Sequence, residues 1–409
     1  MKKTLWTRNF TLVTVATILG AAGGIAGNFA LSFLVYDETK STLAAALLLA
    51  LQILPQVVIP MVAAPFMDRL PRKPFLVGGD VANGILYSLA GVYLLLCRFS
   101  YVGYLAFSLL LSSLGAFDQL AYNSIYPKLI PADLEEKGYT VSGMIYPVLM
   151  VIMTPVASVL YAHIGVGNIL LLQGGLSLLA ALIEGQIRVK EESRMAEGFS
   201  FRQWRQDMKD AASYLKKEKG LRNIYSYMAV TNGVGGSISP ILVAFFRTMP
   251  GFTIAMYSFF SVAEFAGRSL GGLFSYHVKI PPKKRWGFAF SVYMIYEAMD
   301  ACLLWLPYPL MLANRSVCGF LGINSATMRE AAVQRYIPES YRTRLNAFFS
   351  VLISAATSVL TLAVGAMGEI LDLRVCLSVC GVFTGLVCLM TIGKNRRAVG
   401  KIYNQETQY

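Results

Sequence analysis

The feature that most constrains this chain is a succession of long apolar runs separated by short polar gaps. A helix of about 20 residues is needed to cross the apolar part of a bilayer. Backbone groups in lipid have to be hydrogen-bonded within the chain, so each run is predicted to be a helix. Twelve runs are long enough, near residues 10–35, 42–66, 75–97, 101–123, 139–163, 166–187, 222–246, 253–276, 286–306, 309–330, 345–371 and 375–393. The sequence therefore predicts an all-α integral membrane protein.

The positions of the charges support this division. Charged residues make up 14% of the chain and hydrophobic residues 56%, whereas about a quarter of a soluble domain is charged. Of 36 Lys and Arg residues, 29 lie at the two ends or in alternate gaps, and three lie inside spans. The other gaps hold only Lys40, Arg98, Arg247 and Arg374. Because cytoplasmic loops are the basic ones, both termini are predicted to be cytoplasmic. Topology thus accounts for the net charge of +13, and nucleic acid is not expected as a partner.

A faint internal repeat suggests that the two halves are related. The segment from Gly115 to Pro131 aligns without gaps with the segment from Gly322 to Pro338, at a constant offset of 207 residues. A shared offset over a span and its following loop implies two duplicated six-helix units. The expected division is an N-terminal bundle over 1–187, a cytoplasmic linker over 188–221, a C-terminal bundle over 222–393 and a cytoplasmic tail over 394–409.

The linker contains a second kind of helix pattern. Ser200 and Gln203 have the spacing of a capping box, and Trp204, Met208, Ala211 and Leu215 follow at helical spacing. We expect an amphipathic helix here. A helix lying on the membrane surface is preferred to one that binds a partner.

A short cationic turn joins the second and third spans. It reads Ala64-Pro-Phe-Met-Asp68-Arg69-Leu-Pro71-Arg72-Lys73. The turn resembles the signature loop of the major facilitator superfamily, Gly-x-Leu-Ala-Asp-Arg-x-Gly-Arg-Lys, although Ala64 and Pro71 replace its glycines. The resemblance implies that Asp68, Arg69, Arg72 and Lys73 help to hold one conformational state, with Asp80 bracing the arginines. The alternative is a solvated turn whose charges only set the topology.

The resemblance to the superfamily has implications for the whole chain. Its fold has twelve transmembrane helices in two parallel six-helix repeats, with a substrate site between the repeats near the bilayer midplane. A narrower resemblance is to the macrolide-efflux and siderophore-exporter branch of bacterial permeases. It rests on Leu54-Pro55, on the cationic turn and on Asp80, and it implies a location in the bacterial cytoplasmic membrane.

Charges inside spans are costly and are therefore functional candidates. Glu264 and Arg268 are four residues apart and share one face of the eighth span. A self-neutralising pair and a proton-coupling site are both open interpretations of these two residues. Asp300 and Arg315 lie at similar depth in the ninth and tenth spans, so they are expected to pair between helices.

The helix arrangement of the superfamily suggests roles for individual residues. Its third, sixth, ninth and twelfth helices are supporting ones, which implies structural roles for Glu297 and Asp300. A carboxylate near the midplane can bind and release a proton as water access alternates, and the candidates are Glu264 and then Asp118. Arg329 and Glu330 are candidates for a cytoplasmic gate. The cavity or substrate candidates are Asn28, Phe33, Phe117, Asn232, Arg268 and Arg315, and packing roles are the alternative for the two asparagines.

Together these patterns predict a secondary active transporter, not an enzyme. The expected activity is proton-coupled efflux of a small amphipathic molecule, such as a macrolide-like drug or a siderophore, by alternating access. No cofactor or metal is expected, because the sequence contains neither a phosphate-binding loop nor metal-ligand spacings. The expected partners are the substrate, protons and membrane lipids, and the chain is expected to be a monomer. The alternatives are a lipid or lysolipid flippase, an importer of a polar nutrient, and a membrane-embedded receptor or enzyme.

Overall fold

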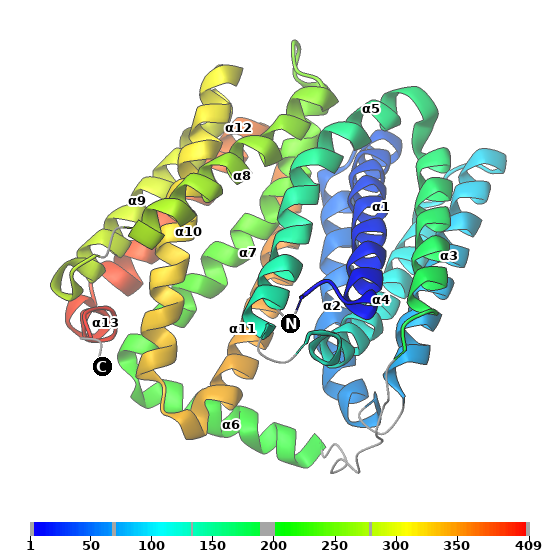
Figure 1. Ribbon diagram of the computed structural model, residues 1–409. Helices are drawn as coiled ribbons and strands as arrows, with labels where there is room; N and C mark the ends of the chain where they lie inside the picture. Colours follow the sequence, from blue (N-terminus) through cyan, green and yellow to red (C-terminus); the bar gives the residue numbers. More distant parts are fainter. Residues whose placement is uncertain (1–3, 68–70, 132–133, 189–200, 278–279, 406–409) are drawn as a thin grey trace. The chain divides into compact units, whose positions relative to one another are not determined.

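The computed structural model of the chain is built from helices (Figure 1). It describes residues 4–67, 71–131, 134–188, 201–277 and 280–405. The helices are α1 (Arg8–Thr39), α2 (Thr42–Met67), α3 (Arg72–Leu96), α4 (Tyr101–Leu129), α5 (Glu135–Glu184), α6 (Phe201–Lys217), α7 (Lys219–Thr248), α8 (Ile254–His277), α9 (Arg285–Cys302), α10 (Tyr308–Tyr336), α11 (Glu339–Ile370), α12 (Leu373–Cys388) and α13 (Arg396–Tyr403).

The predicted twelve-helix membrane fold is confirmed. In the described chain, nine helical stretches are long and apolar enough to cross a membrane. One of them, α5, contains both the fifth and the sixth predicted spans. Gly165 interrupts it with φ 75° and ψ 169°, a conformation that glycine adopts without a steric penalty. The charged helices α8 and α10 complete the set of twelve.

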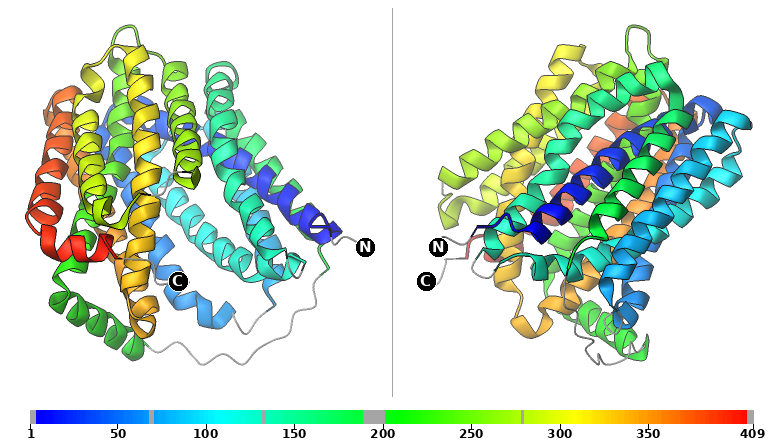
Figure 2. Two further views of the ribbon diagram at one scale, coloured as in Figure 1. Left: turned by 60° about the vertical axis from the view of Figure 1, so that its left-hand side comes forward. Right: turned by 45° about the vertical axis from the view of Figure 1, so that its right-hand side comes forward.

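Contacts divide the chain into two compact units. The first unit comprises Met1–Lys40 and Leu51–Phe199, and the second comprises Ser41–Ala50 and Ser200–Tyr409. The start of α2 therefore groups with the second unit. Within the first unit, α5 packs along both α1 and α3 (Figure 2). Within the second, α8 packs on α10, α7 on α11 and α9 on α12.

Glycines allow the closest of these approaches. A Cβ atom on Gly267 of α8 would lie 1.8 Å from the carbonyl oxygen of Ser316 in α10. One on Gly319 of α10 would lie 2.3 Å from the carbonyl oxygen of Glu264 in α8. Backbones can approach this closely only where a side chain is missing, as is common between membrane helices. These two glycines bring the charges of α8 and α10 to one place.

The predicted linker helix is present as α6, but part of its apolar face is covered by protein. Ala211 and Leu215 are buried in the core of the second unit, and Tyr214 stacks on Tyr341 of α11 at 4.8 Å between ring centroids. Arg344 of α11 forms an ion pair with Asp207 at 2.9 Å. This part of the apolar face thus packs on the protein itself, and the expected position of the helix on the membrane surface stays a prediction.

The cationic turn is only partly within the described residues. Asp68 and Arg69 lie outside them, and Arg72 begins α3 with a side chain that is not described. Lys73 donates from Nζ to the carbonyl oxygen of Gly185 at 2.7 Å, which ties the start of α3 to the end of α5. The conformational role implied by the superfamily stays a prediction.

Candidate functional site

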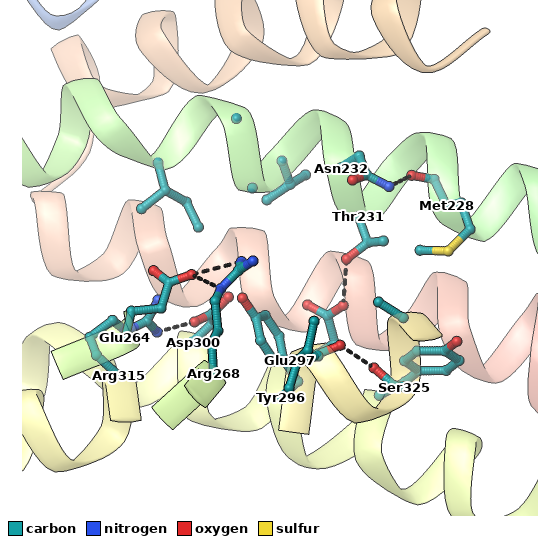
Figure 3. Close-up of a pocket in the computed structure, with 18 of the residues that line it drawn as sticks. Met228, Thr231, Asn232, Glu264, Arg268, Tyr296, Glu297, Asp300, Arg315 and Ser325 are labelled. Carbon is teal, nitrogen blue, oxygen red and sulfur yellow. Dashed lines mark hydrogen bonds and ion pairs between the residues drawn. The ribbon is translucent and has the colours of Figure 1, made fainter. Parts of the chain in front are cut away.

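The second unit contains a cavity of about 460 Å³ between α7, α8, α9 and α10. This size lies in the range typical of small-molecule sites. Its wall combines apolar side chains with an unusual density of charge for a membrane interior (Figure 3). The charged and amide side chains that line it are Asn232, Glu264, Arg268, Glu297, Asp300, Arg315 and Arg329.

Glu264 and Arg268 form the ion pair that their four-residue spacing predicts. Arg268 donates from Nε to Oε1 of Glu264 at 2.9 Å, and its Nη2 lies 2.8 Å from the same oxygen. Figure 3 shows the two side chains together at the cavity wall. The carboxylate is thus already neutralised by its neighbour. Binding a proton at Glu264 would remove the partner of Arg268.

Asp300 of α9 and Arg315 of α10 form the second predicted pair. The contact involves Nη2 of Arg315 and Oδ1 of Asp300, and both side chains are only 9% exposed. The same guanidinium also donates to Oδ1 of Asn314 at 3.2 Å. Burial makes this pair a fixed connection between two helices, because separating the partners would leave a charge without compensation.

Glu297 of α9 is the carboxyl group with the most unusual surroundings. It is only 4% exposed. It accepts hydrogen bonds from the hydroxyl groups of Tyr227 at 2.9 Å, Thr231 at 3.0 Å and Thr384. All three donors are hydroxyl groups, and no basic side chain among the described residues donates a hydrogen bond to Glu297. Glu297 can therefore gain or lose a proton without breaking an ion pair.

The positions of Glu297 and Asp300 differ from what the resemblance implied. A supporting helix was expected to keep both residues away from the cavity, yet both line it. The reason is packing. In the second unit α9 packs against α10 and α12, and the face of α9 that carries Glu297 and Asp300 borders the cavity. Sequence spacing carries no information about this packing.

The other candidates in the second unit lie in or beside the cavity. Asn232 lines it, but the Nδ2 group donates to the backbone oxygen of Met228 at 2.7 Å. Arg329 also lines it, whereas Glu330 lines a small neighbouring pocket and accepts from Nε2 of Gln334 at 2.9 Å. The gate role of Arg329 and Glu330 stays a prediction.

The first unit has a cavity of its own, of about 500 Å³. Asp80, Asp118 and Glu184 line it and come from α3, α4 and α5. Oδ1 of Asp118 and Oε2 of Glu184 are buried and have no hydrogen-bond partner among the described residues. Glu184 was missed by sequence reasoning, since a carboxylate at the end of an apolar run looks like a loop charge. The bracing of the turn by Asp80 stays a prediction.

Three further candidates line neither cavity. Asn28 and Phe117 are exposed. Phe33 is fully buried, and its ring packs against those of Phe29 and Tyr161 at 5.0 and 5.9 Å between centroids. Aromatic and amide residues in a membrane helix can face lipid, protein or a cavity, so composition alone did not separate these cases.

Sequence comparison agrees with this architecture. Residues 11–299 match the Major Facilitator Superfamily. The chain belongs to this superfamily. It is 30% identical over 135 residues to a Bacillus subtilis protein named "Uncharacterized MFS-type transporter YvqJ". It is 24% identical over 294 residues to "Uncharacterized MFS-type transporter YkuC" from the same organism. The chain spans 31% of the first relative and 66% of the second, and these matches cover 33% and 66% of the chain.

Solved structures show the same fold at low sequence identity. An inward-facing, unoccupied bacterial homolog of the human lysosomal transporter Spinster has a TM-score of 0.72 at 12% identity, with full coverage of both chains. The nucleoside transporter NupG has a TM-score of 0.69 at 12% identity, covering 95% of this facilitator and 99% of NupG. Such identities establish the fold alone. This facilitator is therefore a multi-pass membrane protein with the fold of secondary transporters.

Proposed function

We propose that this facilitator is a proton-coupled secondary transporter that exports a small amphipathic molecule, drug-like or siderophore-like, by alternating access. It would act as a monomer in the bacterial cytoplasmic membrane, with both termini in the cytoplasm and with protons and the substrate as its partners. The superfamily supports transport. The narrower resemblance of the cationic turn to the macrolide and siderophore exporters supports the direction and the substrate class.

The observation that carries the proton coupling is the environment of Glu297. A buried carboxylate without a basic partner is costly in a membrane interior, and a proton removes that cost directly. Hydroxyl groups can bond to Glu297 in both of its protonation states, because a hydroxyl group can donate to a carboxylate or accept from a carboxylic acid. Glu297 is therefore a better proton carrier than Glu264, whose charge Arg268 already compensates.

The cavity wall supports an amphipathic substrate. Val234, Ile238 and Leu242 of α7 line one part of it, and the charged groups of α8, α9 and α10 line another. A molecule with an apolar body and a few polar groups satisfies both parts. A substrate near Glu297 would compete with the proton for the same carboxylate, and this competition couples the two movements.

Transport in proteoliposomes tests the proposal. Purified protein is reconstituted, a pH gradient is imposed, and flux of a radiolabelled macrolide is compared for wild type, Glu297→Gln and Glu264→Gln. Glu38→Gln is the matched control, because Glu38 lies at the exposed end of α1. We expect gradient-driven flux in wild type and in the control. Glu297→Gln is expected to bind the macrolide but to lose the response to the gradient.

Other results would contradict parts of the proposal. If Glu297→Gln keeps the gradient response and Glu264→Gln loses it, the coupling carboxylate is Glu264. If wild-type flux ignores the gradient, proton coupling is wrong. Gradient-independent movement of a fluorescent lysolipid in the same vesicles would then favour the flippase alternative.

A further inference from the structure

We propose that the cavity of the first unit binds an organic diamine, a molecule with a protonated amino group at each end of an apolar chain. The inference goes beyond the proposed function, because it assigns a second binding site, with a ligand class of its own, to the other unit. It rests on that function for the transport of the diamine, whereas binding itself does not depend on proton coupling.

The first argument is charge. Asp80, Asp118 and Glu184 all line this cavity, and the described residues around it include no Lys, Arg or His. Lys73, on the same helix as Asp80, does not line the cavity and donates to the backbone oxygen of Gly185. In the second unit, by contrast, two of the three cavity acids are paired with arginines. The described wall of the first cavity therefore contains acidic groups but no positive charge to balance them. A bound cation would provide that positive charge.

The second argument is unused hydrogen-bonding capacity. Gln173 lines the cavity and is only 5% exposed, yet its Oε1 has no hydrogen-bond partner in the part of the chain that the structure describes. Oε2 of Glu184, at 3% exposure, and Oδ1 of Asp118 are in the same condition. All three atoms are acceptors. Buried acceptors without partners are rare in folded proteins, and a ligand rich in N–H donors would satisfy them.

A glycine makes room for the amide of Gln173. A Cβ atom on Gly23 of α1 would lie 1.9 Å from Oε1 of Gln173. Gly23 lines a neighbouring cavity, which Gln173 also borders. A purely structural amide would be expected to find a donor among the neighbouring groups.

The third argument concerns the kind of cation. Among the described residues, no group of three acidic, His or Cys side chains is close enough to hold a metal ion. The three carboxyl groups come from three different helices, α3, α4 and α5, so a ligand with two charged ends can contact the acidic groups of two helices at once. Leu76, Leu111 and Tyr146 line the same space. They suit an apolar linker, and tyrosine rings also attract alkylammonium groups.

The test measures binding to the purified full-length protein in detergent, without any gradient, by isothermal titration calorimetry at constant ionic strength. Hexamethylenediamine is compared with hexylamine, which has the same chain and one charge, and with sodium chloride. The variants are Asp118→Asn and Glu184→Gln. Glu38→Gln is the matched control, because it removes an exposed carboxylate near the end of α1 that does not line this cavity.

We expect wild type and the control to bind the diamine at least about tenfold more tightly than the monoamine, which corresponds to one additional charged hydrogen bond. Each cavity variant is expected to lose about tenfold in affinity for the diamine and much less for the monoamine. The ligand comparison in wild type tests the inference even if a variant fails to fold.

The inference would be overturned if the two amines bound with equal affinity. It would also be overturned if sodium chloride gave a binding signal and neither amine did. Unchanged diamine binding in both folded cavity variants would overturn it as well. These failures are distinct from a failure of the proposed function. Diamine binding that persists in Glu297→Gln, together with gradient-independent flux in vesicles, would refute the proton coupling and leave this site intact.

Discussion

The crossing of α8 and α10 allows one prediction to be worked out in detail. Gly267→Ala places a Cβ atom 1.8 Å from the carbonyl oxygen of Ser316, whereas ordinary Cβ contacts begin at 3.4 Å. The obstacle is backbone, which cannot rotate away as a flexible side chain would. The helices therefore have to separate by about 1.6 Å, which is the difference between the two distances.

Such a separation has a definite cost. It lengthens the hydrogen bond from Oγ of Ser316 to the backbone oxygen of Ala263, now 2.8 Å. Overpacking of this kind typically costs about 1–3 kcal/mol. We expect Gly267→Ala to be destabilised by about that amount, and by more than the favourable helix propensity of alanine can offset, which is at most about 1 kcal/mol.

Thermal unfolding in detergent, followed by tryptophan fluorescence, measures this effect. Gly272→Ala is the matched control, because it lies on the same helix and its Cβ would meet nothing within 4 Å. We expect the control to be at least as stable as wild type. If Gly267→Ala unfolds at the same temperature as Gly272→Ala, the close approach of α8 and α10 does not exist as described, and the geometry of the second cavity has to be revised.

Two further predictions concern single acidic residues. Glu369 accepts at Oε1 from Oγ of Ser41 at 2.7 Å and from the backbone N–H of Leu43 at 2.9 Å, so it acts as the N-terminal cap of α2. We expect Glu369→Ala to cost about 1 kcal/mol and to speed amide hydrogen exchange at the start of α2, while unchanged exchange there would contradict the capping role. Asp300→Asn leaves the buried Arg315 without its counter-charge and is expected to cost about 3–5 kcal/mol. In a double-mutant cycle measured by unfolding, Arg315→Met should recover part of this loss, and purely additive effects would disprove the coupling.

Local patterns predicted much of the fold. Helix positions follow from runs of apolar residues, and the break between the fifth and sixth spans was expected where Gly165 now interrupts α5. The Glu264–Arg268 pair was equally predictable, because four residues complete about one helical turn. In each case the relevant atoms are close along the chain, so the geometry of one helix is sufficient.

Contacts between helices were harder to predict. The Asp300–Arg315 pair was anticipated because the two residues lie at equal depth on consecutive spans. Glu297 offered no such clue, since its hydroxyl partners come from α7 and α12, which are distant in the sequence. Gln173 was missed for the same reason. An amide within an apolar run gives no sign of whether it faces a cavity, lipid or another helix.

The sequence by itself determined that this chain crosses a membrane many times, which of its segments are helical and which loops are basic. These properties depend on hydrophobicity and charge summed over short windows. Only the tertiary structure decided which charges meet. Glycines at a few crossing points set how closely helices approach. A Cβ atom on Gly381 of α12 would lie 2.8 Å from the backbone oxygen of Glu297, and this approach of α12 brings the hydroxyl group of Thr384 to the Glu297 carboxylate. The chemistry of each cavity therefore depends on packing between helices, which local sequence patterns do not encode.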